Sequence, residues 1–495
     1  MQQRVKKVVI AGGGTAGWTV AAALSGQLGA LLDITIVESD AIGTVGVGEA
    51  TIPTHKAFHR LLGVDEQAFM RATRASFKLG IQFENWGKLG DSYFHSFGKI
   101  GKSTWMGDFQ HMWHQAKAEG GGGDLDDYCF ELQAAKAGKF ATSEKANINY
   151  AYHLDASLYA GFLRKYSEER GVKRIEGKIN NVHVDPENGF ITQLDLDNDQ
   201  SIEGDLFIDC TGFRSLLTGD ALGVGYDDWS HYLPMNRAIA VQTKSSGKIV
   251  PYTRSIARKA GWQWRIPLQH RVGNGHVYSS AHMSDDDAYK ILVDNIDGEM
   301  VSDPRPIKFT TGRRKQCWTK NCIAFGLSSG FLEPLESTSI HLVQIGVTRL
   351  IQMFPFGGVN EAIQRHYNFH SEKELESIRD FLILHYKLNT RTDSDFWKEC
   401  AAMDIPDTLR HRIELYKNNA IAYQDGLDLF RVDSWMQVFR GQGLESDGYH
   451  LMGRMLPQAQ LEHALETLKA NIGKTVSGMP RHEDFLKQYC GIDDV

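Results

Sequence analysis

The sequence predicts a doubly wound α/β fold with an inserted antiparallel sheet and a mostly helical C-terminal portion. Three observations lead to this prediction. Residues 8–24 pass from an apolar, β-branched run through a glycine-rich turn into helix-forming residues, which is the pattern of a strand, a tight turn and a helix. Apolar stretches around 238–241, 262–266 and 276–279 alternate like antiparallel strands. Residues 360–490 have helical character and many charged and aromatic side chains.

The opening turn has the spacing Gly12-x-Gly14-x-x-Gly17 of a dinucleotide-binding loop. Gly12 permits the tight turn, Gly14 lets the backbone approach a pyrophosphate, and Gly17 lets the helix pack closely on the strand. The phosphates then meet free N–H groups at the helix N-terminus. A second strand over 34–37 ends in Glu38, about twenty residues after the last glycine, where an acid binds a ribose hydroxyl. A purely structural glycine turn explains this combination less well.

The dinucleotide is predicted to be FAD rather than NAD, because the first strand begins at residue 8 and the rest of the chain fits a flavoprotein. The expected fold therefore resembles glutathione reductase and the flavin hydroxylases. The glycine-rich segment 43–53 directly follows Glu38, and its backbone is expected to lie against the flavin.

Further elements are predicted from periodicity along the chain. They are a helix over 54–76, a strand over 78–84, a helix over about 156–170, strands over 172–184, 191–196 and 206–209, and a helix from 340 to 351.

Two parts of the chain are predicted to have different roles. The first is a module over 1–355, whose nucleotide fold is drawn from 1–55, 150–215 and 320–352 and whose substrate sheet is drawn from about 78–100 and 225–315. The second is the helical portion 356–495, expected to cover the substrate site.

Composition narrows the function. The 495 residues are 42% hydrophobic and 23% charged with a net charge of −7, which argues against a nucleic-acid partner. No apolar run reaches the length of a membrane span, and the N-terminus lacks a signal peptide's apolar core. The six cysteines are scattered, and Cys317 and Cys322 are interpreted as buried thiols rather than half of a zinc site. We therefore expect a cytoplasmic protein without a bound metal.

Chemistry is suggested at three places. Pro334 and the run 336–339 mark a helix start, whose N–H groups can bind an anion such as a halide or the flavin's own N1–C2=O edge. A plain capping motif is the alternative there. Trp262 and Trp264 lie on one face of a strand, which by spacing alone indicates a core stripe. Lys78 by itself would be a solvated surface charge.

Together these residues resemble one family, the FAD-dependent halogenases of the tryptophan halogenase type, over nearly the whole chain. The resemblance rests on the following motifs: Gly12-x-Gly14-x-x-Gly17, the strap 46–53, Phe77-Lys78-Leu79-Gly80, Tyr150-Ala151-Tyr152-His153-Leu154-Asp155, Gly261-Trp262-Gln263-Trp264-Arg265-Ile266-Pro267 and Phe331-x-x-Pro334-x-x-Ser337. The paired tryptophans followed by Ile-Pro are the specific mark, whereas the glycine turn alone indicates a flavoprotein.

The resemblance implies a two-component reaction. A separate NAD(P)H flavin reductase supplies reduced FAD, which with O2 oxidises chloride or bromide to hypohalous acid. Lys78 then receives the hypohalous acid, either through a hydrogen bond or as a haloamine, and Glu336 positions the agent or removes the ring proton. Trp262 and Trp264 are implied to keep the organic substrate away from the flavin.

The resemblance also implies the binding residues. A halide is expected at Thr338 and Ser339, and an aromatic substrate at His95, Phe97, Trp435 and Phe439. The implied FAD contacts are Gly12, Gly14, Thr15, Ala16, Gly17, Glu38, Val47, Ala50, Ile179, Gly212, Gly326, Leu335 and Ile340.

Two departures from the family bear on substrate choice. Ser339 stands where family members commonly have glycine, so chloride and bromide both remain open. The stretch 433–439 lacks the Tyr-Tyr pair that holds the polar end of free tryptophan, whereas 95–97 keeps the ring-stacking residues. We therefore expect an electron-rich aromatic such as indole, or a tryptophan-like compound, with a tryptophan inside a peptide as a further option.

Two other functions remain consistent with the sequence. One is an FAD-dependent aromatic monooxygenase on the same fold, and the other is a flavin-binding protein without turnover. The tryptophan pair argues against the first, and the presence of both Lys78 and Glu336 argues against the second. A homodimer is left open.

Overall fold

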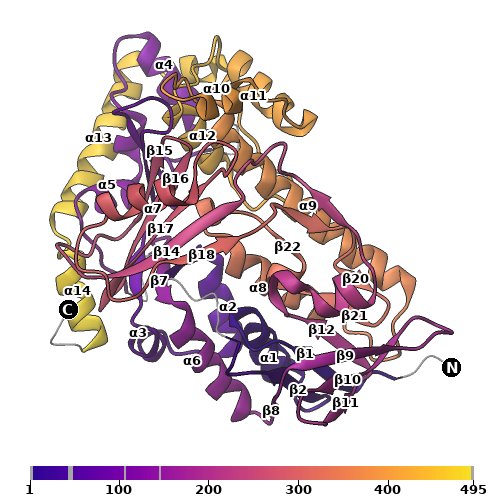
Figure 1. The fold of residues 1–495 in the computed structure, drawn as a ribbon. Helices are drawn as coiled ribbons and strands as arrows, with labels where there is room; N and C mark the ends of the chain where they lie inside the picture. Colours follow the sequence, from indigo (N-terminus) through magenta and orange to yellow (C-terminus); the bar gives the residue numbers. More distant parts are fainter. Residues whose placement is uncertain (1–3, 43–47, 105–106, 144–146, 492–495) are drawn as a thin grey trace. The chain divides into compact units, whose positions relative to one another are not determined.

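The computed structural model describes residues 4–42, 48–104, 107–143 and 147–491, and these fall into two compact units. Unit 1 contains 1–75, 154–238 and 306–376, and unit 2 contains 76–153, 239–305 and 377–495. Each unit is thus assembled from three separate stretches (Figure 1). This division differs from the predicted one. Most of the predicted substrate sheet, from about 78–100 and 225–315, is grouped with the C-terminal helices and not with the nucleotide fold.

Unit 1 is built on a six-stranded sheet with the order β20-β21-β12-β1-β2-β8. The elements of this unit are β1 (Lys7–Ala11), α1 (Thr15–Leu28), β2 (Asp33–Glu38), β3 (Gly48–Ala50), α2 (Thr54–Leu62), α3 (Glu66–Thr73), α6 (Ala156–Glu168), β8 (Lys173–Glu176), β9 (Ile179–Val184), β10 (Ile191–Leu196), β11 (Ser201–Glu203), β12 (Leu206–Asp209), β13 (Tyr226–Asp228), β19 (Gly312–Arg314), β20 (Trp318–Thr319), β21 (Cys322–Ala324), β22 (Gly330–Phe331) and α8 (Ser339–Gln352).

The centre of the sheet is parallel. β1 pairs in parallel with β2 on one side and with β12 on the other, and β12 pairs in parallel with β21. The chain order therefore reverses around β1, and ligands of doubly wound sheets bind at the carboxyl ends of the strands where that happens. This confirms the predicted fold class and the predicted return of residues 320–352 to the nucleotide fold.

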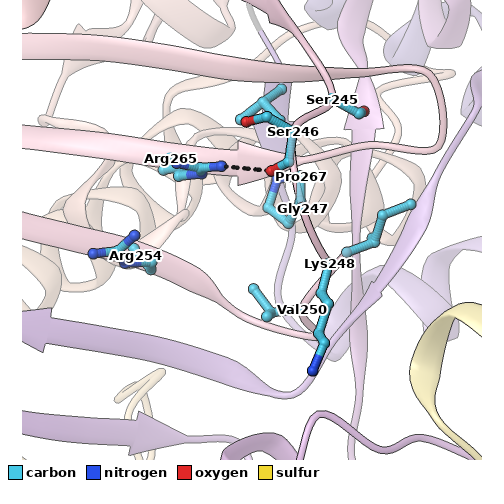
Figure 2. Close-up of a pocket in the computed structure, with 10 residues that line it drawn as sticks. Ser245, Ser246, Gly247, Lys248, Val250, Arg254, Arg265 and Pro267 are labelled. Carbon is cyan, nitrogen blue, oxygen red and sulfur yellow. Dashed lines mark hydrogen bonds between the residues drawn. The ribbon is translucent and has the colours of Figure 1, made fainter. Parts of the chain in front are cut away.

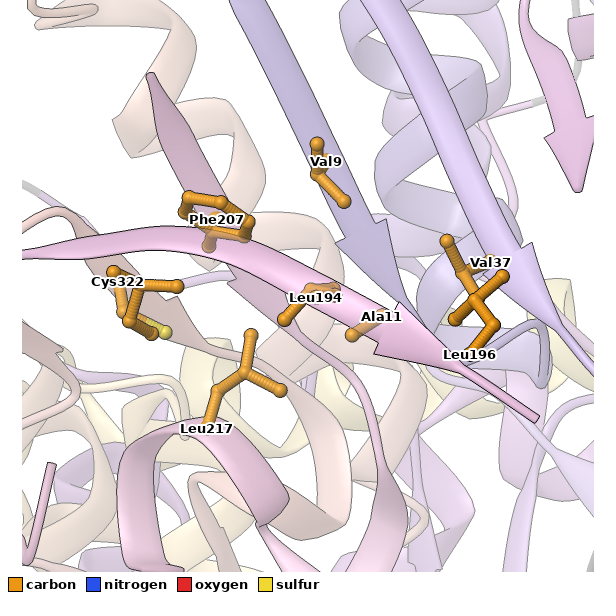
Figure 3. Close-up of a cluster of buried hydrophobic side chains, with 9 residues drawn as sticks. Val9, Ala11, Val37, Leu194, Leu196, Phe207, Leu217 and Cys322 are labelled. Atoms are coloured by element: carbon orange, nitrogen blue, oxygen red, sulfur yellow. The ribbon is translucent and has the colours of Figure 1, made fainter. Parts of the chain in front are cut away.

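A buried apolar cluster joins this sheet to the smaller sheet β9–β11 (Figure 3). Leu194 and Leu196 of β10 pack with Val9 of β1 and Phe207 of β12, all at most 4% exposed. Burying each such side chain contributes roughly 1.5–3 kcal/mol. The cluster fixes the floor beneath the dinucleotide turn.

The predicted helix 54–76 is wrong in one respect, since the segment forms two helices, α2 and α3. Gly63 lies between them with a φ of 66°, and its N–H bonds the carbonyl of Arg60. A left-handed glycine at that place ends a helix. Periodicity continued across the break because both helices bury one apolar face.

Unit 2 is built on a seven-stranded sheet with the order β18-β14-β17-β16-β15-β5-β6. Its elements, including four that cross a unit boundary, are β4 (Ser76–Lys78), β5 (Gly80–Glu84), β6 (Ser92–Ser96), α4 (Phe109–Ala118), α5 (Phe130–Lys136), β7 (Ala151–Asp155), β14 (Arg237–Lys244), β15 (Thr253–Arg258), β16 (Gly261–Pro267), β17 (Arg271–Tyr278), α7 (Asp285–Asp294), β18 (Arg305–Lys308), α9 (Glu361–Lys387), α10 (Asp395–Ala402), α11 (Asp407–Asn419), α12 (Val432–Gly441), α13 (Gln458–Ser477) and α14 (His482–Cys490).

The seven-stranded sheet contains the predicted antiparallel pairs, β15 with β16, β16 with β17 and β5 with β6, whereas β15 and β5 pair in parallel. The single strand predicted over 78–84 is wrong, because β4 and β5 pair with different neighbours. Gly80 allows the change, since a Cβ there would lie 2.4 Å from the carbonyl oxygen of His95.

The C-terminal portion is mostly helical, as predicted, and contains α9 to α14. Within the described ranges, no helix combines the length and apolar character needed to cross a membrane.

Candidate active site

The dinucleotide turn is shaped by what its glycines lack. Gly12 has a φ of 103°, and a Cβ there would lie 2.3 Å from the carbonyl oxygen of Cys210. A Cβ on Gly17 would lie 1.9 Å from the carbonyl oxygen of Gly12. Gly14, in contrast, has no protein atom within 4 Å of its Cβ position. The turn is therefore tight on the protein side and open at Gly14, where the backbone of such a turn would approach a pyrophosphate.

Three strands end at this turn. Ala11 of β1, Asp209 of β12 and Ala324 of β21 lie in register along the parallel sheet. Gly326, with a φ of 63°, brings the third turn so close that its Cβ position is 2.8 Å from the Cβ of Ala16 on α1. The carboxyl ends of β1, β12 and β21 thus form one edge, which is where such sheets bind cofactors.

Asp209 fixes the second of these turns, and the sequence analysis did not single it out. Its buried carboxylate accepts hydrogen bonds from the N–H groups of Thr211, Leu217 and Thr218 at 3.0, 3.1 and 2.7 Å. Gly212 follows with a φ of 72°, and its carbonyl accepts from the Ser328 hydroxyl at 3.1 Å. An acid at the end of a buried strand, followed by Thr-Gly, was the available signal.

Glu38 lies directly over the turn, since a Cβ on Gly13 would lie 1.5 Å from its Oε2. Its carboxylate accepts from the Trp18 indole N–H at 3.1 Å and from Arg174. These partners hold the acid at the end of β2, where a ribose hydroxyl would reach it.

The strap begins outside the described residues, so the predicted contact Val47 lies beyond what the structure describes. Glu49 and Ala50 follow in β3. Burial, together with the nearby charge of Asp155, raises the pKa of Glu49 to about 7. A carboxyl group in this strap can therefore change its charge near neutral pH.

Three further predicted FAD contacts, Ile179, Leu335 and Ile340, lie at two separate places in unit 1. Ile179 starts β9 and packs against the apolar cluster beneath the sheet. Leu335 and Ile340 are buried, at 2% and 4% exposure, on either side of the start of α8. Their contact with a cofactor stays a prediction.

The start of α8 combines strain with a buried carboxylate. Ser337 has a φ of 60°, an unusual conformation for a residue with a side chain. Glu336 and Thr338 are each 1% exposed, whereas Ser339, the first residue of α8, is exposed. The first turn of α8 carries no acidic residue, so its N–H groups and dipole favour an anion.

Lys78 is fully buried in unit 2, with 0% of its surface exposed. It is the last residue of β4, where it pairs with Ala151 of β7. Its Nζ lies 5.2 Å from the centroid of the Phe97 ring, within the range of a cation–π contact. The simple expectation of a solvated surface lysine is therefore wrong for this residue.

An aromatic group lies among the predicted substrate residues. The His95 ring centroid is 5.4 Å from that of Phe381 on α9 and 6.0 Å from that of Phe430. Phe381 and Phe430 stack at 3.7 Å, and Trp435 of α12 meets Phe381 edge-on at 4.8 Å. The structure thus brings His95 and Trp435 to one shared ring, that of Phe381; neither Phe381 nor Phe430 was predicted from the sequence.

Phe439 lies one turn further along α12 and stacks on Tyr416 of α11 at 4.5 Å. Both side chains are at most 1% exposed. This ring packs helix against helix, and its predicted role toward substrate remains a prediction.

The two tryptophans of β16 are buried, and their ring centroids lie 6.0 Å apart. Trp264 covers Gly275 of β17, where a Cβ would lie 2.1 Å from its ring. Trp262 lies 6.4 Å from Trp86, in a group of large aromatic side chains. Both indoles are therefore fixed in place.

A small pocket elsewhere in unit 2 is lined by the cations Lys248, Arg254 and Arg265 (Figure 2). Arg254 forms a two-pronged ion pair with Glu84 at 2.6 and 2.9 Å, and Arg265 is paired with Asp297. The cavity measures about 20 Å³, which is room for one water molecule. It is too small for an aromatic substrate.

The family model for tryptophan halogenase matches residues 7–458. The chain belongs to the tryptophan halogenase family.

Relatives and solved structures agree with this assignment. The halogenase is 35% identical to a tryptophan 6-halogenase of Streptomyces toxytricini, over 88% of this chain and 89% of that protein. It is 32% identical to a tryptophan 7-halogenase of Lentzea aerocolonigenes, over 99% of this chain and 100% of that one. The solved structure of a flavin-dependent halogenase from Xanthomonas campestris superimposes with a TM-score of 0.97 and 51% identity, covering 99% of both chains.

The halogenase is therefore a flavin-dependent enzyme, and its predicted cofactor FAD and co-substrate halide are confirmed at the level of the family. The residues of unit 1 fit FAD, because Gly14 leaves its side of the turn open and α1 begins without an acidic residue. Bound there, reduced FAD supplies the activation of O2 that oxidises the halide. The residues that would hold it are those of the glycine turn, for the phosphates, and Glu38, for the ribose.

Proposed function

We propose that this halogenase transfers chlorine or bromine to an electron-rich aromatic without a charged amino-acid head, such as indole, through Lys78. The observation that carries the proposal is the fully buried Lys78 beside the Phe97 ring. Burying an ammonium costs several kcal/mol, and a titratable group held in such a setting is a candidate for a chemical role. A lysine that handles hypohalous acid benefits from such a dry setting, because water then neither competes for its hydrogen bonds nor carries the reagent away.

Lys78 can act in two ways. Its ammonium can donate a hydrogen bond to the oxygen of hypohalous acid, which makes the halogen more electrophilic, or its amine can carry the halogen covalently. Glu336, buried before α8, is proposed to position the agent or to take the proton from the ring. Thr338 and Ser339, at the N-terminus of α8, are proposed to bind the halide.

The substrate's ring is proposed to lie at the aromatic group of His95, Phe97 and Trp435. Phe381 and Phe430 are added by the structure, since both contact His95. Stacking recognises a ring regardless of its substituent. A zwitterion instead needs paired donors and acceptors, and leaving either charge unpaired costs kilocalories.

The enzyme is proposed to depend on a separate NAD(P)H flavin reductase for reduced FAD. The support is the resemblance to two-component halogenases and the match to tryptophan halogenases over most of the chain.

The test is a substrate panel with FAD, a generic reductase and each halide, read by mass spectrometry. We expect a halogenated product from indole, with kcat/KM at least equal to that for free tryptophan. A preference for free tryptophan above about tenfold, some 1.4 kcal/mol, would mean that a zwitterion site exists. A hydroxylated product that forms equally without halide would identify a monooxygenase instead.

A further inference from the structure

Lys78 sits on a very short strand, and the strand's support decides where the lysine lies. β4 has three residues, Ser76 to Lys78, and pairs with β7 along one side. Side chains alternate along a strand, so Ser76 and Lys78 share one face and Phe77 occupies the other. Three residues paired along one edge are held weakly by the ladder alone.

The first additional support is His482, the first residue of α14. Its Nε2 accepts a hydrogen bond from the backbone N–H of Phe77 at 3.2 Å, and its Nδ1 lies 2.8 Å from the carbonyl oxygen of Ile249. A carbonyl oxygen can only accept, so Nδ1 carries the proton and Nε2 keeps its lone pair. These two bonds require the neutral ring, because a protonated Nε2 could not accept from Phe77.

The His482 ring is itself held firmly. Its backbone N–H donates to the carbonyl of Gly138 at 2.9 Å, and Lys139 forms an antiparallel bridge with Arg481. The next residue, Glu483, accepts from the N–H of Ile249 at 2.7 Å. The start of α14 is thus hydrogen-bonded to two segments, at Gly138 and at Ile249. The imidazole therefore has little freedom to move away from β4.

The second support is His153 of β7, on the lysine's face of the strand. The Ser76 hydroxyl donates to the carbonyl oxygen of Pro267 at 2.6 Å. Having used its proton, the same oxygen accepts from Nδ1–H of His153 at 3.2 Å. Nε2 of His153 then accepts from the Thr253 hydroxyl at 2.9 Å. These hydrogen bonds connect β4 to Pro267, the last residue of β16, the strand that carries the two tryptophans.

The electrostatic setting agrees with these bonds. Burial, followed by the positive charge of Lys78, keeps the pKa of His153 well below its usual value. Burial lowers the pKa of His482 to about 4. Both rings are therefore neutral near pH 7, and neither adds a second positive charge beside the lysine.

We propose that His153 and His482 are positioning residues for Lys78, which support β4 on the lysine's face and at its backbone edge, respectively, and thereby fix the place of the lysine ammonium. The proposal rests on the proposed role of Lys78 as the group that receives hypohalous acid. His482 lies beyond residues 7–458, the span that the family model matches, so α14 takes part in the support of the site from outside that span. The histidines act through the backbone and through Ser76, not on the reacting atoms.

A pair of variants separates the two bonds of His482. In His482→Gln the amide oxygen can take the place of Nε2 and still accept from Phe77. In His482→Asn the amide nitrogen can take the place of Nδ1 and still donate to Ile249, but the bond to Phe77 is lost. His463→Asn, on the exposed side of α13, is the matched control for the same change.

The first measurement is hydrogen exchange of the peptide containing Phe77 in the protein without FAD. We expect at least tenfold faster exchange in His482→Asn, and rates near wild type in His482→Gln and His463→Asn. Unchanged exchange in His482→Asn, or equal changes in the Asn and Gln variants, overturns the proposal. This readout is independent of halogenation and so stands even if the proposed function fails.

The second measurement is the partition of hypohalous acid, using bromide, indole and monochlorodimedone as the trap. We expect His482→Asn to form at least tenfold less bromoindole while oxidising reduced FAD at the wild-type rate, with the missing halogen in the trap. His482→Gln should restore product to within about threefold. A parallel loss of product and trapped halogen overturns the proposal, since it places the defect at hypohalous acid formation.

Thr253→Val tests the support on the lysine's face of β4, and it also serves as a check because it leaves α14 unchanged. It removes the hydroxyl that bonds His153 while keeping the shape of the side chain. We expect the same shift from product to trapped halogen, about threefold to tenfold in size. A wild-type partition in this variant excludes His153 from positioning Lys78. Absence of any halogenated product with the wild-type enzyme would instead refute the proposed function.

Discussion

The dinucleotide turn and the lysine strand are built by opposite means. At the turn, the backbone itself forms the site, and the glycines matter because a Cβ would collide with Cys210 or with the turn's own carbonyl. At β4 the backbone is too short to hold itself, and side chains from β7 and α14 hold it through hydrogen bonds. A backbone site is sensitive to added atoms, whereas a side-chain-supported site is sensitive to removed ones.

The largest effect is expected at the end of the lysine strand. Lys78→Ala should lower halogenation by at least a thousandfold, more than 4 kcal/mol of barrier, and leave FAD binding unchanged. The reason is that Lys78 belongs to β4 and not to the turn. Product formation by mass spectrometry and FAD titration by fluorescence check both parts. Activity near wild type would remove Lys78 from the mechanism.

The turn can be tested with two single methyl groups. Gly12→Ala should destabilise the protein and reduce FAD affinity by more than a hundredfold, because the Cβ would lie 2.3 Å from a carbonyl oxygen at a positive φ. Gly14→Ala should leave the melting temperature without FAD unchanged, since its Cβ position is open, yet bind FAD at least tenfold more weakly. Wild-type FAD affinity in Gly14→Ala would contradict a pyrophosphate at this position.

Glu336 is a buried carboxylate just before α8, and replacing it tests whether it takes part in the chemistry. Glu336→Gln keeps the size of this buried group and removes its base function. We expect about a hundredfold slower halogenation, some 2.7 kcal/mol, with the melting temperature within a few degrees of wild type. A rate within about threefold of wild type would exclude Glu336 from the chemistry.

Acid should weaken the side-chain-supported strand. The pKa of His482 is about 4 when folded and about 6.5 when unfolded, so the unfolded chain binds more protons between these values. The contribution of His482 to the unfolding free energy is complete above about pH 6.5. It falls as the pH drops toward 4, by about 2 kcal/mol at pH 5. Urea unfolding at pH 7.5 and pH 5 measures how much unfolding free energy is lost on acidification. This loss should be smaller in His482→Gln than in the wild type by about 2 kcal/mol. An equal loss in both proteins would argue against a buried neutral ring.

The smallest effect is expected in the strap. The pKa of Glu49 is raised to about 7, so its contribution to stability is complete below about pH 4.5 and is lost as the pH rises through 7. Glu49→Gln should therefore raise the unfolding free energy at pH 8 and leave it unchanged at pH 4.5. Because solvent reaches part of the Glu49 side chain, we expect on the order of 1 kcal/mol rather than the about 3 kcal/mol that the full shift would give. Thermal unfolding at the two pH values measures the difference, and equal effects would contradict the raised pKa.

The turn could be predicted from the sequence because everything that defines it is local. Strand, glycines and helix follow one another within residues 8–28, and Glu38 comes a fixed distance later. The support of Lys78 could not, since His153 and His482 reach β4 through tertiary contacts that leave no periodic signal. Phe381 and Phe430 were missed for the same reason, because each lies within an ordinary helical or loop pattern. Gly63 shows the converse, in that a local residue ended a helix that periodicity had continued.

The hydrogen bond between Phe77 and His482 joins residues 405 positions apart. During synthesis on a ribosome the lysine strand therefore emerges early and waits for nearly all of the remaining chain before its imidazole partner exists. Chains that end just before α14 would keep every segment of unit 1 but lack the imidazole that bonds Phe77. We therefore expect a tag, a truncation or a protease cut near the C-terminus to change the fidelity of halogen transfer more than FAD binding.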